Sequence, residues 1–109
     1  MSGYSLHPEA YADIDQICDY IAFDSLDAPD RVRKELFATF DLLVPFPNRG
    51  HRRPDLSSRP LRFIVVRDYL IAYAPEERAI WVIAVMHGRL DPRVMAAILR
   101  GREDFLPRT

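Results

Sequence analysis

Arginine supplies most of the side chains in this chain that could bind or act on a charged partner. Fourteen of the 15 basic residues are Arg, whose planar guanidinium matches phosphate and carboxylate groups and stays charged. Six of them lie between positions 49 and 67. This clustering predicts a surface for an anionic partner, and the candidate phosphate- or target-binding residues are Arg49, Arg52, Arg53, Arg62, Arg67 and Arg89.

His87 raises the possibility of catalysis. Metal-independent RNA cleavage needs a general base, a general acid and fixed cations on the phosphate. His87 could transfer the proton while Arg62 and Arg89 hold the phosphate, so these three form the candidate catalytic set. The alternative is structural: a His at a strand end before Gly anchors the turn by a hydrogen bond, and Arg62 pairs with an acid or extends to solvent.

Other site chemistry finds no support in the sequence. Four scattered Gly cannot form a phosphate-binding loop, and His7, His51 and His87 lack companion ligands at metal-binding spacing. We therefore expect neither a metal nor a cofactor. The longest apolar run has eight residues, Ala79 to Met86, whereas a membrane-spanning helix needs about 20. A lone Cys18 and a start without a signal peptide predict a cytoplasmic protein.

Length and composition predict one folded domain over residues 1–109. Apolar residues make up 49% of the chain and charged residues 28%, which is typical of globular proteins. The net charge of -1 disfavours a stand-alone nucleic-acid binder. The charge is uneven, because residues 1–48 hold nine acids and three bases whereas the rest holds seven acids and 12 bases. This asymmetry also favours a face for an anionic partner.

Apolar periodicity predicts a helical hairpin after a short strand over Tyr4–His7. The first helix runs from Pro8 to Ala22, and its apolar face holds Tyr11, Ile14, Ile17, Cys18 and Ile21. The second helix runs from Pro29 to Pro45, with an N-cap expected in residues 24–27. The short connection predicts an antiparallel pair.

Three strands are expected next, over 61–66, 69–74 and 79–87. Their short connections predict an antiparallel meander. A last helix begins with Asp91 as cap and ends at Gly101. In the last strand, Ile80, Val82, Ala84 and Met86 are expected on one face, opposite the face of Trp81, Ile83, Val85 and His87. Both faces are apolar, so either the last helix or a partner must cover the face away from the hairpin. The predicted fold class is α+β, with the hairpin packed on an antiparallel sheet.

Several residue strings, taken in order, resemble the ParE/RelE superfamily of bacterial toxins over about residues 4 to 95. The strings lie at residues 4–10, 13–17, 19–22, 46–50 (Phe-Pro-Asn-Arg-Gly), 60–62, 69–73 and 85–91, where the last reads Val-Met-His-Gly-Arg-Leu-Asp. The His-Gly-Arg-x-Asp ending resembles the ParE branch in particular.

This resemblance implies a toxin of a type II toxin–antitoxin module. ParE-like members act on DNA gyrase, whereas RelE-like members cleave messenger RNA on the ribosome. Both are held inactive by a cognate antitoxin, so a toxin–antitoxin hetero-oligomer is expected. RelE-like nucleases keep an aromatic residue just after the last strand and paired Lys before the meander. Here no Tyr follows Tyr73, and Arg52 and Arg53 replace the Lys pair. The ParE reading is therefore favoured, without catalytic residues, and mRNA cleavage is the alternative.

Overall fold

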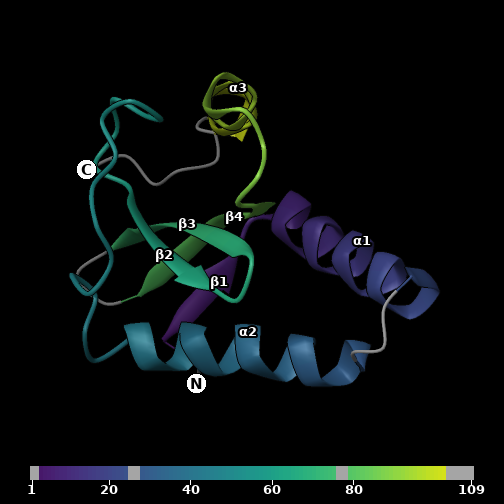
Figure 1. Cartoon of the computed structure of the whole chain (residues 1–109). Coiled ribbons are helices and arrows are strands. Elements are labelled where there is room, and N and C mark those ends of the chain that lie inside the picture. The colour runs from purple at the N-terminus through teal and green to yellow at the C-terminus, as the bar shows by residue number, and fades with distance from the viewer. Residues whose placement is uncertain (1–2, 25–27, 76–78, 103–109) are drawn as a thin grey trace.

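The computed structural model describes residues 3–24, 28–75 and 79–102. The elements are β1 (Tyr4–Leu6), α1 (Pro8–Asp24), α2 (Pro29–Leu43), β2 (Arg62–Val66), β3 (Tyr69–Pro75), β4 (Ile80–His87) and α3 (Pro92–Arg102). A four-stranded sheet is covered by α1 and α2 on one face and by α3 on the other (Figure 1). The fold class is α+β, as predicted. No described helix is long and apolar enough to span a bilayer.

Helix α1 begins at Pro8, whose fixed φ suits a first helical turn. Its buried stripe contains Ala10, Ile14, Cys18 and Ile21. The predicted placement of Tyr11 in the core is wrong, because its side chain is 52% exposed. Ala10, one position earlier, points to the sheet instead. A small residue inside the stripe allows close packing, and periodicity alone did not distinguish it from its larger neighbour.

Helices α1 and α2 run in opposite directions, as predicted (Figure 1). The two helices are joined on their exposed sides by an ion pair of 2.9 Å between Arg33 and Asp15. The N-cap position of α2 is Ala28, which makes no side-chain capping bond. The expectation of a cap in 24–27 was therefore wrong, and the helix begins at Pro29, whose fixed φ suits a first helical turn. Residues 25–27 lie outside the described residues.

The strand order is β1-β4-β3-β2. Strands β2, β3 and β4 form the predicted antiparallel meander. Strand β1 pairs in parallel with β4, from Tyr4–Ile80 to Leu6–Val82, so the complete sheet is mixed. The sequence carries no signal for this direction, because β1 lies far from its partner along the chain and no turn links them.

A β-bulge changes the faces of β4 from those predicted. Ala72 pairs with Ala84, but Tyr73 pairs with Val82, so Ile83 is the extra residue. An extra residue reverses the alternation of side chains beyond it. Ile80 and Val82 therefore face the hairpin, while Ala84 and Met86 face α3.

Helix α3 covers the second face of the sheet, which resolves the two alternatives left by the apolar pattern. Met95 and Leu99 of α3 pack with Ile83 and Met86, and the connection before β2 adds Leu56 and Leu61. Asp91 caps the helix by accepting the Arg93 N–H at 2.8 Å. The expected end at Gly101 is wrong, because the helix includes Arg102, whose side chain is held by partners described below.

The loop 46–50 is fastened to the sheet by two side chains. Tyr73 Oη donates to the Pro47 carbonyl and accepts the Gly50 N–H, both at 2.8 Å. Arg62 Nη1 donates to the Gly50 carbonyl at 2.8 Å and to the Asn48 carbonyl at 3.3 Å. A Cβ on Gly50 would lie 2.8 Å from Tyr73 Oη, so glycine is required by this close approach.

His7 is expected to make stability depend on pH. Its buried ring accepts the Glu9 N–H through Nδ1 at 3.0 Å. Burial, and then the nearby Arg102 charge, lower the pKa of His7 in the folded protein, while the unfolded chain keeps a value of about 6.5. The folded state therefore binds fewer protons than the unfolded chain. The free energy of unfolding is highest above about pH 6.5, and it declines as the pH falls toward the pKa of His7 in the folded protein.

The measurement is the free energy of unfolding in urea between about pH 5 and 8. His7→Gln, whose amide oxygen can accept the same bond without titrating, should flatten the decline. His51→Gln is the control, because the His51 side chain is exposed. Equal slopes in the wild type and His7→Gln would contradict this assignment.

Candidate functional site

Two turns meet at one end of the sheet and define the candidate site. The β2–β3 turn contains Arg67 and Asp68, and the segment after β4 contains Gly88 and Arg89. The Gly88 N–H donates to the Asp68 carbonyl at 2.7 Å. A Cβ on Gly88 would lie 3.2 Å from that oxygen, so a side chain there would press on the hydrogen bond. This contact brings two cations that are distant in sequence to the same end of the sheet.

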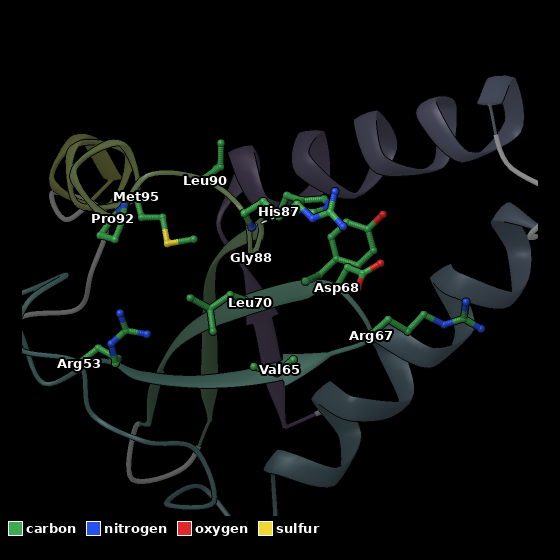
Figure 2. A pocket seen from close by; sticks show the side chains of 12 residues that line it. Arg53, Val65, Arg67, Asp68, Leu70, His87, Gly88, Leu90, Pro92 and Met95 are labelled. Carbon is green, nitrogen blue, oxygen red and sulfur yellow. Dashed lines mark hydrogen bonds between the residues drawn. The ribbon is translucent and has the colours of Figure 1, made fainter.

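A hollow of about 320 Å³ lies at this end. Its apolar lining includes Val65, Leu70, Leu90 and Met95, and its cationic lining includes Arg53, Arg67 and Arg89. In Figure 2, Arg53 lies on the α3 side and Arg67 on the α2 side, with Val65 and Leu70 between them. We call this site the arginine hollow. Apolar surface ringed by guanidinium groups suits an acidic side chain with an apolar neighbour.

The three arginines of the hollow differ in their partners. Arg53 forms a two-bond pair with Asp55, at 2.9 and 2.8 Å, and this bond lowers the pKa of the Asp55 carboxyl. Arg67 Nε donates to Glu35 on α2. Among the described residues, none is found to pair with the exposed Arg89 guanidinium. Arg89 is thus the cation of the hollow that can take an external anion without giving up an internal one.

Arg67 also has an unusual backbone, with φ of 54°. A non-glycine residue in this left-handed region costs roughly 1 to 2 kcal/mol. The two-residue connection between β2 and β3 requires this conformation, and the ion pair with Glu35 orients the side chain. Backbone strain of this kind is often found at functional sites.

His87 has the anchoring role given by the structural alternative. Its Nδ1 accepts the Arg89 N–H at 3.0 Å, so the neutral ring carries its proton on Nε2. The ring packs edge to face on Tyr69, its cross-strand neighbour, with centroids 5.5 Å apart. His87 therefore orients the segment that presents Arg89.

The remaining predicted arginines lie elsewhere. Arg62 fastens the loop 46–50 and does not line the hollow, so the candidate catalytic set of His87, Arg62 and Arg89 is not brought together there. Arg49 lies in the same loop, beside the exposed Phe46. Arg52 is exposed and lines none of the described hollows beside His87.

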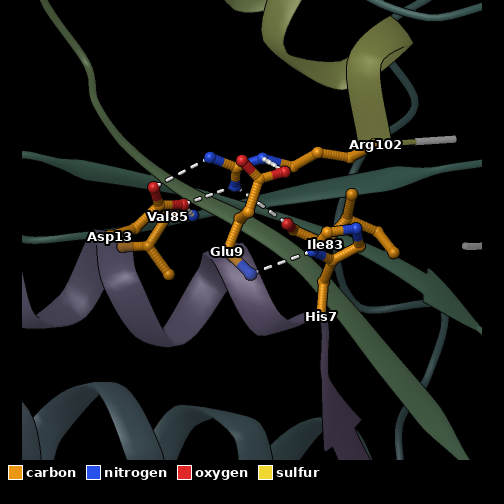
Figure 3. A network of polar contacts seen from close by, with 6 residues as sticks. All are labelled: His7, Glu9, Asp13, Ile83, Val85 and Arg102. Carbon is orange, nitrogen blue, oxygen red and sulfur yellow. Dashed lines mark hydrogen bonds and ion pairs between the residues drawn. The ribbon is translucent and has the colours of Figure 1, made fainter.

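An ion pair that the sequence did not reveal lies between α1 and α3. Arg102 donates to both carboxylate oxygens of Asp13, at 2.6 and 2.9 Å, and to the Ile83 carbonyl at 3.0 Å (Figure 3). Asp13 also accepts the Val85 N–H at 3.0 Å. Strand β1 ends at Leu6, which pairs with Val82, so the rest of β4 has no neighbouring strand on this side. There the side chains of Asp13 and Arg102 supply the hydrogen bonds that such a strand would make.

Metal binding finds no support in the described part of the chain. No three His, Cys, Asp or Glu side chains gather there as a ligand set. What the site offers is a binding surface of guanidinium groups on an apolar floor.

A family model supplies the decisive comparison. The model for the ParE toxin of the type II toxin–antitoxin system parDE matches residues 4–92. The chain belongs to the ParE toxin family. The match includes all the strands, the hairpin and Arg89, and it ends at the start of α3.

The ParE fold is also found in a solved structure. A chain from a chromosomal ParDE toxin–antitoxin system of P. aeruginosa superposes with a TM-score of 0.62, at 19% sequence identity. The alignment covers 80% of this chain and 96% of that one. No curated protein matches this ParE-family chain closely enough to count as a relative.

Proposed function

We propose that this ParE-family toxin inhibits DNA gyrase by binding it, and that the arginine hollow is the contact surface. The observation that carries the proposal is the exposed Arg89 beside an apolar floor, which has no partner among the described residues and is held in place by His87 and by the Gly88–Asp68 hydrogen bond. Inhibition by binding needs a preorganised surface and no proton transfer. Arg53 and Arg67 extend the same positive surface, and neutralisation by a cognate antitoxin in the cytoplasm completes the proposed module.

Cleavage of mRNA is the alternative function. It requires a phosphate held between His87 and two arginines, but Arg62 is bound to the loop carbonyls. Nδ1 of His87 is occupied by the Arg89 N–H, which leaves Nε2 as the atom available for proton transfer. The geometry therefore supports binding better than acid–base catalysis.

Two assays with wild type and His87→Gln distinguish these functions. The first is DNA supercoiling by purified gyrase, and the second is cleavage of ribosome-bound message. We expect inhibition in the first assay, little change with His87→Gln because a Gln side chain can keep the turn hydrogen bond, and no cleavage in the second. Codon-positioned cleavage that falls about 10²- to 10⁴-fold with His87→Gln would instead establish a nuclease.

A further inference from the structure

Two carboxylates beside the arginine hollow pair with its arginines. Asp55 accepts two hydrogen bonds from Arg53, and Glu35 of α2 accepts one from Arg67. The four side chains are between 30% and 54% exposed, and exposed ion pairs contribute little to the stability of a protein. Stability of the fold is therefore a weak reason for an acid on each of these arginines.

The acids change the charge that the hollow presents to a partner. Of the residues that the structure describes, three arginines line the hollow. Three carboxylates lie beside them, because Asp68 also lines the hollow and because Glu35 and Asp55 pair with its arginines. The hollow is therefore rich in guanidinium groups, but with its border it is close to neutral.

This charge balance affects nucleic acids and proteins differently. A nucleic-acid backbone carries a charge at every phosphate, and its affinity for a protein rises with the number of phosphates that cations neutralise. An arginine that already holds an internal carboxylate must give up that pair before it can neutralise a phosphate. An acidic side chain of a protein needs only one guanidinium, and the exposed Arg89 can supply it. The hollow therefore favours a protein surface over a polyanion.

On the basis of the function proposed above, we propose that Glu35 and Asp55 determine the specificity of the arginine hollow by excluding nucleic acid from it. Gyrase works on DNA, so a toxin that inhibits gyrase acts beside a large excess of phosphate groups. Unpaired arginines on that surface would hold the toxin on DNA and lower its concentration at gyrase. The two acids prevent this, and they leave Arg89 for the acidic contact of the target.

Two double variants of equal net charge test this role. The hollow variant combines Glu35→Gln with Asp55→Asn and removes both paired carboxylates. The control variant combines Asp15→Asn with Asp41→Asn, two exposed acids that do not line the hollow. It also frees one arginine elsewhere, because Asp15 pairs with Arg33 on the hairpin. The probe is a labelled DNA duplex of about 20 base pairs, and the readout is its Kd by fluorescence anisotropy between about 50 and 200 mM KCl.

The hollow variant should bind the duplex at least about 10-fold more tightly than the wild type at about 50 mM salt. Its plot of log affinity against log salt should be steeper by about 2, because each freed arginine neutralises about one more phosphate. The control variant should stay within about 3-fold of the wild type, because its charges change away from the arginine cluster. Thermal midpoints of both variants should stay within about 4 °C of the wild type.

Two outcomes would overturn the proposal. Equal DNA affinities and salt slopes for the two double variants would show that net charge alone controls DNA binding. A wild type that binds the duplex as tightly as the hollow variant would show that the acids exclude nothing. If the hollow variant is unstable, the single variants Glu35→Gln and Asp55→Asn decide, since each should steepen the salt slope by about 1.

A second measurement separates this proposal from the proposed function. Without DNA, immobilised gyrase should bind the hollow variant at least as tightly as the wild type, because the freed guanidinium groups can still meet a carboxylate. Added duplex should then remove the hollow variant from gyrase and leave the wild type bound. If the wild type does not bind gyrase, the proposed function fails, but the comparison of DNA affinities still decides what the two acids do.

Discussion

Replacing Arg102 with Met should lower the free energy of unfolding by about 3 to 5 kcal/mol, the usual result of removing one partner from a buried ion pair. The side chains of Arg102 and Asp13 are 10% and 15% exposed. Without the guanidinium, the Asp13 carboxylate loses two charged hydrogen bonds and the Ile83 carbonyl loses its donor. Urea denaturation at neutral pH gives the change directly.

Arg100→Met is the matched control for this prediction. Arg100 is exposed on the same helix, so its loss should change stability by less than about 0.5 kcal/mol. A double variant, Asp13→Leu with Arg102→Met, should regain part of the loss, because it removes the stranded charge. A loss below about 1 kcal/mol for Arg102→Met alone would show that the pair does not hold α3 in place.

Reversing the charge at Arg89 should weaken gyrase inhibition at least about 30-fold, which corresponds to a hot-spot contribution of about 2 kcal/mol. Arg89→Glu places a carboxylate where the proposed contact needs a cation, and like charges across an interface repel. The midpoint of supercoiling inhibition measures the effect. Because Arg89 is exposed, the free energy of unfolding should stay within about 1 kcal/mol.

Arg93→Glu separates a local contact from a general charge effect. The Arg93 side chain is 92% exposed, pairs with Asp91 at the surface and does not line the arginine hollow. The two variants change the net charge equally. If both weaken inhibition alike, the interaction is non-specific attraction, and the hollow is not the contact surface.

The fold was largely predictable from local patterns. Apolar spacing predicted both helices of the hairpin, and short polar connections predicted the meander. The β-bulge at Ile83 and the parallel pairing of β1 were not predictable, because each depends on contacts between segments far apart in the sequence. The wrong prediction for Tyr11 has a related cause. Apolar periodicity identifies the face of a helix that is buried, but packing in the folded protein decides which residues at the edge of that face are buried.

The candidate site was predicted in part. Composition identified the arginines, and the structure places Arg53, Arg67 and Arg89 around one hollow. Arg62 instead donates to carbonyls of the loop 46–50, and Arg49 and Arg52 do not line the arginine hollow. The apolar residues that line the arginine hollow could not be predicted, because in the sequence Leu70 and Met95 look like ordinary core residues. Asp13 and Arg102 gave no signal, since their pairing exists only once the chain has folded.

Asp13 and Arg102 are 89 residues apart, so the ribosome adds the two partners of this ion pair at different times. At a synthesis rate of about 5 to 20 residues per second, roughly 4 to 18 seconds pass between the addition of the acid and that of its partner. During that interval the hairpin can form. Ile83 and Met86 are added only near its end, and the sheet face to which they belong has no cover until α3 is complete. A growing chain is therefore more prone to aggregation than the finished toxin.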